Sequence, residues 1–475
     1  MLDFVFDNSR KQTDSAIVII ADNSKVLQNE RLVKRVGKTI IESLLNALQA
    51  EAVNDESDVF IKTYSAQTPC LFLTINKKDP FKTGKTLYSK LKKYANADIY
   101  VGSDLDESFF EKMLIAMENE NYSFDKYCTK KKAEDFDKLE TVQFFGVKKP
   151  NMKKVAAITN AVRYARDLGN EPANRLTPYE FIKDVERLSY LDIDVEVLDE
   201  TAMKEENFGL ALAVAQGSSN SPYTAILKWK GNPNKEDFDC GLVGKGVIYD
   251  SGGLSLKSRS GLRSMKQDMS GAADVVSVIK AIALQRLPVN VVAVVTMVEN
   301  MPSAHAYKVD DILTSMSGQT VEIIDTDAEG RLVLADSLWY IQKRFKVKTL
   351  IDIATLTGAA EVIFGGVYAA IFGNDDKLIQ KLIKTGEYVN ERLWPLPLNA
   401  DYDKRMNSSI ADMKNFDKPR MAVPSTAAAF LQRFVHKSTK WAHLDIGGCE
   451  CDEKDKVSTG FGVMLLEDFI HNFVK

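Results

Sequence analysis

Short apolar runs alternate with stretches of helical periodicity along this chain, and no other feature restricts its fold as much. The apolar runs have the lengths typical of buried strands, and several of the stretches between them repeat apolar residues at helical spacing. In the second half of the chain, the predicted strands lie at Ile193–Leu198, Thr224–Lys230, Cys240–Tyr249, Val289–Val298, Val321–Ile324 and Thr349–Ile353. Strands that alternate with helices are typical of layered α/β folds. The sequence therefore predicts an α/β fold.

The length of 475 residues favours two domains over one core. The first part has its own alternation, with an apolar run at 16–21 and a helical pattern at about 31–50. The polar stretch Gly146–Asn151 contains a proline and is typical of a linker. We therefore predict a small N-terminal α/β domain without catalytic motifs over residues 1–150. Residues 151–475 are predicted to form a larger α/β catalytic domain with a mixed central sheet flanked by helices.

Composition and cysteine usage indicate an ordinary globular protein. Hydrophobic residues make up 45% and charged residues 27% of the chain, which argues against disorder. The formal net charge of −4 makes nucleic acid an unexpected main partner. The five cysteines are odd in number and show no CxxC spacing, so reduced thiols are expected. The first residues are acidic rather than basic and no apolar run is long enough for a bilayer, so we expect a cytoplasmic protein without a membrane partner.

Three segments of the second half concentrate ionisable residues in apolar or glycine-rich surroundings. The first runs from Leu242 to Lys257; it carries Lys245 inside an apolar strand and Asp250 at the strand's end. A charged lysine inside a buried strand costs several kcal/mol when it has no partner. Lys245 is therefore neutral, paired with a carboxylate or bound to a metal, unless it extends from an edge strand to water.

The other two segments add three carboxylates. Asp268 precedes a predicted helix at Ala272–Leu284, where an acid by itself is most simply a cap or a dipole partner. In an extended chain, Asp327, Glu329 and Arg331 would share one face. Neighbouring carboxylates repel unless a cation lies between them. The alternative is a solvated acidic turn with an internal pair between Glu329 and Arg331.

Together, four carboxylates balance the charge of two divalent cations. They are Asp250, Asp268, Asp327 and Glu329. Oxygen-rich ligation suits Zn²⁺, Mn²⁺, Mg²⁺ or Co²⁺ in a two-metal site, to which a neutral Lys245 would add a nitrogen. Lys257 and Arg331 remain as cations for the oxyanion of a tetrahedral intermediate. The sequence therefore predicts metal-assisted hydrolysis of an amide or ester.

From about Arg166 to the C-terminus, the chain resembles the leucyl aminopeptidases of peptidase family M17. The family's most diagnostic string, Asn-Thr-Asp-Ala-Glu-Gly-Arg-Leu, is present with one change at Asp325–Leu332. Other matching strings are Arg166–Asn174, Val243–Lys257, Glu299–Pro302, Met316–Glu322, Ala354–Ala359 and Trp441–Ile446. The resemblance implies a metal-dependent aminopeptidase that releases the N-terminal amino acid by attack of a water activated by two metals. It further implies peptide substrates with a free N-terminus and a homohexamer.

The resemblance also implies roles for individual residues. The five expected metal ligands are Lys245, Asp250, Asp268, Asp327 and Glu329. Lys257 matches the lysine that polarises the carbonyl, and Arg331 matches the arginine that holds a bicarbonate proposed as general base. Ala328, Gly330 and Leu356 are expected around that bicarbonate.

Two positions depart from the family's pattern. Asp325 replaces the usual asparagine, and this carboxylate is protonated, paired with a lysine or able to change the metal preference. Glu450 falls near the pocket for the first side chain, which Met265, Thr355 and Gly358 are also expected to line. An acid there would widen acceptance towards arginine or lysine at the first position. The alternative is a glutamate on a loop that faces solvent.

Three other functions compete with peptide hydrolysis. A hexameric DNA-binding or regulatory protein is a second role known in this family, but this chain has no strongly basic stripe. An inactive scaffold is disfavoured because each position expected to bind metal or catalyse is intact. Hydrolysis of another amide, such as cysteinylglycine, differs only in its substrate.

Overall fold

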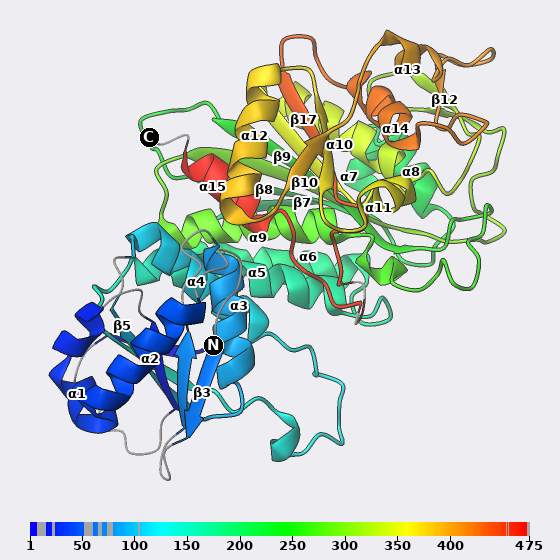
Figure 1. The fold of residues 1–475 in the computed structure, drawn as a ribbon. Coiled ribbons are helices and arrows are strands. Elements are labelled where there is room, and N and C mark those ends of the chain that lie inside the picture. Colours follow the sequence, from blue (N-terminus) through cyan, green and yellow to red (C-terminus); the bar gives the residue numbers. More distant parts are fainter. Residues whose placement is uncertain are drawn as a thin grey trace. The chain divides into compact units, whose positions relative to one another are not determined.

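The computed structural model describes residues 1–6, 16–20, 24–51, 60–64, 69–73, 79–102, 105–452, 454 and 456–472. Within them the chain forms two compact units, Met1–Thr159 and Asn160–Lys475. Both are α/β, and the predicted fold class is confirmed: a small N-terminal domain and a larger C-terminal domain with a mixed sheet (Figure 1). The division between the units falls inside helix α5 (Met152–Asn170), and the domain boundary at residue 150 stays a prediction.

In the described part of the N-terminal unit, a six-stranded sheet has the order β1-β6-β5-β2-β4-β3; β3 and β4 pair antiparallel and the other neighbours in this order pair parallel. Its strands are β1 (Asp3–Val5), β2 (Ala16–Ile20), β3 (Phe60–Tyr64), β4 (Pro69–Leu73), β5 (Asn96–Val101) and β6 (Thr141–Phe145). Its helices are α1 (Glu30–Val36), α2 (Lys38–Glu51), α3 (Pro80–Leu91) and α4 (Glu107–Glu120). The apolar run predicted at 16–21 forms β2, and residue 21 lies outside the described residues.

The helical pattern predicted at about 31–50 is confirmed, and the chain there forms two helices, α1 and α2. Gly37 separates them with a φ of 92°, a backbone conformation that glycine adopts without steric cost. The apolar spacing continues across this break, so periodicity alone did not reveal it.

The larger unit is built on an eight-stranded sheet in the order β15-β14-β17-β13-β9-β10-β8-β7. Its strands are β7 (Asp194–Leu198), β8 (Tyr223–Lys230), β9 (Cys240–Asp250), β10 (Asn290–Asn300), β13 (Thr349–Ala354), β14 (Ala369–Gly373), β15 (Leu393–Pro395) and β17 (Lys440–Asp445). A second, three-stranded sheet contains β11 (Ile312–Thr314), β12 (Thr320–Glu322) and β16 (Met413–Lys414). The central strands β17, β13, β9 and β10 are parallel, and β7, β8 and β14 contribute antiparallel pairs, so the sheet is mixed.

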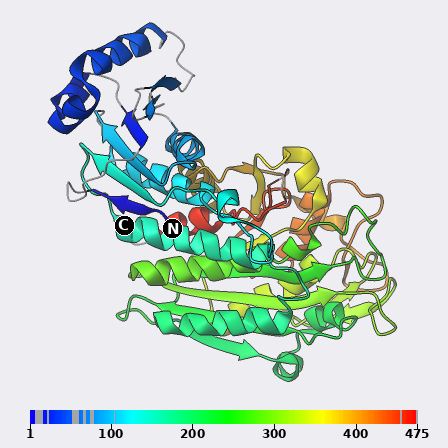
Figure 2. The same cartoon turned by 90° about the horizontal axis from the view of Figure 1, so that it is seen from below.

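Helices cover both faces of this sheet (Figures 1 and 2). The helices that begin after residue 160 are α6 (Pro178–Glu186), α7 (Glu200–Glu205), α8 (Gly209–Ala215), α9 (Ser270–Gln285), α10 (Gly330–Phe345), α11 (Gly358–Phe364), α12 (Asp376–Val389), α13 (Ala400–Lys404), α14 (Val423–Gln432) and α15 (Val463–His471). No helix in the described part of the chain is long and apolar enough to cross a membrane.

Neighbouring residues of β9 face different helices, and this alternation places the site. A Cβ added to Gly244 would lie 2.4 Å from the backbone oxygen of Gly271 in α9, so the glycine permits this close approach. The next residue, Lys245, points to the other face of the strand, as the two-residue period requires. There its Cε would lie 2.5 Å from a Cβ added to Gly330, the first residue of α10. Two glycines therefore allow both helix starts to approach one strand closely.

A buried carboxyl group beside α15 leads to a pH-dependent stability. Glu391 is 5% exposed and accepts hydrogen bonds from the backbone N–H groups of Gly462 (3.0 Å) and Leu465 (2.8 Å). Burial raises the pKa of Glu391 to about 8, whereas an unfolded glutamate has a pKa of about 4.3. Between these values the folded chain keeps a proton that the unfolded chain has lost, so this group makes folding less favourable as the pH rises.

We therefore expect Glu391→Gln to become more stable relative to the unmodified protein as the pH rises from 5 to 8. The gain is at most about 1.4 kcal/mol per pH unit in this window. Urea unfolding at several pH values measures it, with Glu387→Gln on the exposed face of α12 as the control. A stability difference between Glu391→Gln and the unmodified protein that is the same at pH 5 and pH 8 would contradict this expectation.

Candidate active site

Ionisable side chains meet at the carboxyl ends of the central parallel strands. Asp250 is the last residue of β9, Thr355 directly follows β13, and Gly447 lies two residues beyond β17. Ligands of open α/β sheets commonly bind at this edge. A pocket of about 170 Å³ lies here. It is lined by Lys245, Asp250, Lys257, Ser264, Met265, Gln267, Asp268, Asp327, Glu329, Thr355, Leu356, Thr357, Gly358, Glu361, Gly447, Gly448 and Glu450.

Three carboxylates form the centre of the site. One oxygen from each of Asp250, Asp327 and Glu329 lies within 4.8 Å of the other two. Asp250 is 3% exposed and Glu329 is 2% exposed, so little water screens their repulsion. Burial, followed by the charge of Glu329, raises the pKa of Asp250 to about 6 and also raises the pKa of Asp327. Such a group of like charges is stabilised by cations.

Two lysines neutralise part of this charge. Lys245 Nζ lies 2.7 Å from Asp268 Oδ1 and 2.9 Å from Glu329 Oε1, and it donates to the backbone oxygen of Thr355 at 2.9 Å. Lys257 Nζ lies 2.8 Å from Asp250 and 2.5 Å from Asp327. Burial lowers the pKa of each lysine, but the neighbouring carboxylates raise it further, so both pKa values lie above their usual range. In the structure, Lys245 is paired with carboxylates. Because β9 is an interior strand of the sheet, Lys245 does not extend from an edge strand to water.

Asp268 does not cap the helix that follows it. The N-cap of α9 is Met269, which has no side-chain capping bond. Asp268 Oδ1 instead accepts from Lys245 and, at 2.8 Å, from Thr355 Oγ1. Asp268 Oδ2 is buried without a hydrogen-bond partner, and burial raises the pKa of this carboxyl group well above its usual value. An unpartnered, buried carboxylate oxygen beside other carboxylates is suited to bind a cation.

The extended conformation predicted for residues 327–331 is wrong. Glu329 has helical dihedral angles and is the N-cap of α10, so Arg331 lies in the first turn of that helix. The preceding strand β12 ends at Glu322, and the Asn415 side chain then accepts from the N–H of Ile324 at 2.8 Å. The chain turns there. The carboxylates of Asp327 and Glu329 come together because of this turn and the start of α10, and not because of the two-residue alternation of a strand.

Asp325, which departs from the family's pattern, is paired with an arginine and not with a lysine. Its Oδ2 lies 2.9 Å from Arg420 Nη2, and its Oδ1 accepts from the N–H of Asp327 at 3.0 Å. Asp325 therefore stabilises the turn that contains Asp327.

Arg331 lies beside the pocket rather than among its lining residues. It is 2% exposed, and its Nη1 donates to the backbone oxygen of Asn415 at 2.9 Å. Its Nε is buried without a hydrogen-bond partner, and burial lowers its pKa to about 10. Ala328 and Gly330 are likewise absent from the lining, whereas Leu356 belongs to it.

Comparisons with known proteins identify the family. The catalytic-domain profile of the cytosol aminopeptidase family matches residues 163–467. The chain belongs to the cytosol aminopeptidase family. It is therefore a hydrolase of the metallo-exopeptidase type, and aminopeptidase activity on peptides follows from the family.

Relatives and solved structures agree with this membership. A probable cytosol aminopeptidase of Phytoplasma mali is 40% identical over 415 residues, 84% of this chain and 83% of the relative. One from Rickettsia africae is 46% identical over 371 residues, 74% of this chain and 73% of the relative. A mutant of tomato leucine aminopeptidase has a TM-score of 0.85 at 27% identity, with 99% of this chain and 97% of that chain covered. The bottromycin maturation enzyme BotP in complex with Mn has a TM-score of 0.82 at 26% identity, with 98% and 100% covered.

Within this cytosol aminopeptidase fold, the four residues expected around the first side chain all line the pocket. They are Met265, Thr355, Gly358 and Glu450. Sequence reasoning missed Glu361, which lines the same pocket, and Asn300, whose Nδ2 donates to Asp250 Oδ1 at 2.8 Å. Asn300 lies in the matching string Glu299–Pro302, and that position was the available signal. Glu361 follows the string Ala354–Ala359 by two residues, and its place in the pocket depends on α11.

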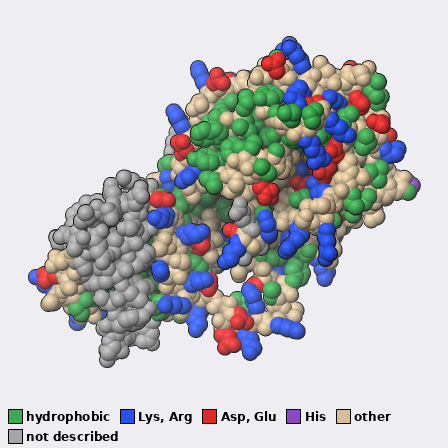
Figure 3. Space-filling model, turned by 45° about the vertical axis from the view of Figure 1, so that its right-hand side comes forward, with side chains coloured by type: hydrophobic (Ala, Val, Ile, Leu, Met, Phe, Trp, Pro, Cys, Tyr) green, Lys and Arg blue, Asp and Glu red, His purple; other side chains and the backbone are tan. Residues whose placement is uncertain are grey.

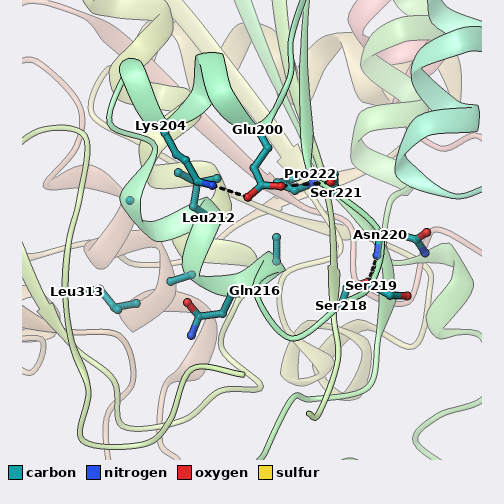
Figure 4. A pocket seen from close by; sticks show the side chains of 13 residues that line it. Glu200, Lys204, Leu212, Gln216, Ser218, Ser219, Asn220, Ser221, Pro222 and Leu313 are labelled. Atoms are coloured by element: carbon teal, nitrogen blue, oxygen red, sulfur yellow. Dashed lines mark hydrogen bonds and ion pairs between the residues drawn. The ribbon is translucent and has the colours of Figure 1, made fainter. Parts of the chain in front are cut away.

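A second pocket, of about 610 Å³, lies beside α7 and α8 (Figure 4). Glu200 is bound there by Lys204 Nζ at 2.6 Å and by Ser221 Oγ at 3.2 Å. Ser218 and Asn220 both donate to Glu299, at 2.5 and 3.0 Å. These polar groups are already paired, and among the described residues the one acidic group with metal-binding spacing is the cluster at Asp250. We therefore place the candidate active site at the first pocket.

Proposed function

We propose that this chain removes the N-terminal residue of peptides with two divalent cations held by Lys245, Asp250, Asp268, Asp327 and Glu329. The observation that carries the proposal is the group of three carboxylate oxygens within 4.8 Å of one another. The unpartnered Oδ2 of Asp268 supports it, because that oxygen is free to bind a cation. The negative charge of the four carboxylates balances the positive charge of two divalent ions.

Two such cations would supply an activated water and polarise the scissile carbonyl group. Cations at these carboxylates would offset the negative charge that raises the pKa of Lys245, and this buried lysine could then serve as a neutral nitrogen ligand. Lys257 would keep its charge beside Asp250 and Asp327 and stabilise the oxyanion that forms during attack.

We further propose bicarbonate at Arg331 as the general base, beside Ala328, Gly330 and Leu356. The buried, unpartnered Nε of Arg331 supports an anion at this place, because a planar guanidinium donates in a fixed geometry. No histidine lines the pocket, whose described lining offers no imidazole base.

The proposed cations are Zn²⁺ or Mn²⁺, with Mg²⁺ or Co²⁺ as alternatives, since oxygen-rich ligation suits each. We propose a cytoplasmic homohexamer, in keeping with the family resemblance. Hydrophobic side chains gather on the face seen in Figure 3, and exposed apolar residues of the larger unit include Val362 and Trp394. An apolar surface of this kind favours self-association. Light scattering measures the molar mass of the assembly in solution and so tests the hexamer.

Removal and return of metal should switch the activity off and on. The chelated protein is expected to lose cleavage of leucine p-nitroanilide and to recover it with Mn²⁺ or Zn²⁺, whereas N-acetyl-leucine p-nitroanilide stays intact throughout. Metal analysis of the restored protein should give two ions per chain. Full activity in the chelated, metal-free protein, or cleavage of the acetylated substrate, would contradict the proposal. No cleavage of any substrate with either metal would favour the inactive scaffold or the DNA-binding protein.

A further inference from the structure

The candidate active site contains two carboxylates beyond those proposed to bind cations. Glu361 extends from α11 and Glu450 from the loop after β17, and both line the pocket. Gly448 brings them together. A Cβ on Gly448 would lie 2.9 Å from the Cα, Cβ and Cγ atoms of Glu361, and its N–H donates to Glu450 Oε2 at 2.6 Å. The two glutamates therefore lie beside one glycine on the wall of the pocket.

Neither carboxylate has a basic partner among the described residues. The two lysines of the pocket are Lys245 and Lys257, which already pair with the central carboxylates. The hydrogen-bond donors that the structure gives the Glu450 carboxylate are backbone N–H groups, those of Gly448 and of Glu450 itself, and the thiol of Cys451 at 3.8 Å, which is a weak donor. Burial, with a smaller contribution from the charge of Glu361, raises the pKa of Glu450, as expected for a carboxyl group without a cation.

The pocket also leaves room beside these carboxylates. A Cβ on Gly358 would meet no atom within 4 Å, so the start of α11 is open. Gly447 and Gly448 also line the pocket and contribute no side chains to it. A long side chain bound in this pocket would therefore find both space and acceptors on its walls.

We propose that Glu361 and Glu450 form the acidic end of the subsite for the first residue, and that the enzyme prefers peptides with arginine or lysine at the N-terminus. This inference rests on the proposed aminopeptidase function. A guanidinium or ammonium group would supply the missing donors, and hydrogen bonds between charged groups are about twice as strong as neutral ones. A leucine side chain would instead cover the carboxylates and remove their water without replacing it.

The test compares arginine, lysine, leucine and norleucine p-nitroanilides with the Mn²⁺-restored protein. The unmodified protein is expected to cleave the arginine substrate with a kcat/KM about tenfold above that of the leucine substrate. Glu450→Gln should lower the arginine-to-leucine ratio by about tenfold or more, mainly through the KM of the arginine substrate. Glu361→Gln should change the ratio in the same direction by a smaller factor, because this side chain is exposed. Glu205→Gln, at the exposed end of α7, is the matched control and should keep the original ratio.

Several outcomes would contradict the proposed subsite. A preference for leucine in the unmodified protein, or one ratio shared by all four proteins, would overturn the proposed subsite while peptide hydrolysis stands. If no anilide is cleaved, the proposed function fails instead, and calorimetry then tests the subsite by itself. Tighter binding of free L-arginine than of L-norleucine, lost in Glu450→Gln, would support the subsite, and equal binding would overturn it. Because Glu361 is exposed, its variant is expected to fold even where Glu450→Gln does not.

Discussion

Replacement of Glu329 with glutamine is expected to lower kcat/KM for leucine p-nitroanilide by about a thousandfold or more. Glu329 is 2% exposed, and its carboxylate lies with those of Asp250 and Asp327 within 4.8 Å. A neutral amide of the same shape removes one of the four negative charges that balance two cations, so it weakens metal binding at the centre of the site. Kinetics and metal analysis of the same preparation measure both effects.

Glu322→Gln is the matched control for this change. Glu322 lies seven positions earlier in β12, where its carboxylate accepts a hydrogen bond from Ser408 Oγ and lies outside the pocket. Its variant should keep the activity and the metal content. A Glu329→Gln protein that retains both full activity and two ions per chain would remove Glu329 from the proposed ligand set.

Replacement of Asp336 with alanine is expected to lower the free energy of unfolding by about 3–6 kcal/mol. Asp336 is completely buried in α10 and accepts from three backbone N–H groups: those of Leu210 at 2.9 Å, Ala211 at 3.1 Å and Met316 at 2.8 Å. Alanine leaves all three donors buried without a partner, at a cost of about 1–3 kcal/mol each. Urea unfolding measures the loss.

The asparagine variant separates the hydrogen bonds from the shape of the side chain. In Asp336→Asn the amide oxygen still accepts from Leu210 and Ala211, whose N–H groups share one carboxylate oxygen, so a smaller loss is expected. Asp237→Ala, in an exposed loop, is the control and should lie within about 0.5 kcal/mol of the unmodified protein. A loss below 1 kcal/mol in Asp336→Ala would mean that water reaches these N–H groups.

Much of the larger unit could be predicted from local patterns. The predicted strand Cys240–Tyr249 corresponds to β9 (Cys240–Asp250), and the predicted helix Ala272–Leu284 to α9 (Ser270–Gln285). Long buried elements carry a strong periodic signal, because most of their residues contact the core. The prediction failed where a side chain distant in sequence holds a turn, as Asn415 does beside Asp325. The helical pattern at 31–50 was right but did not show the break at Gly37.

The amino-acid sequence by itself determined the chemistry that this protein brings to its site. Four carboxylates and two lysines occur in three segments with apolar or glycine-rich surroundings, and their types and spacing predicted hydrolysis assisted by two cations. The sequence also determined the alternation of strands and helices, because the apolar face of each element must be buried against another element.

Only the tertiary structure decided which of these groups meet. Lys245 lies between Asp268 and Glu329 because β9 runs inside the sheet, with β13 and β10 on either side and the starts of α9 and α10 on its two faces. Glu361 and Glu450 share one pocket because the carboxyl ends of β13 and β17 lie at the same edge. Strand order depends on contacts between residues far apart in the chain, and such contacts leave no local periodicity to read.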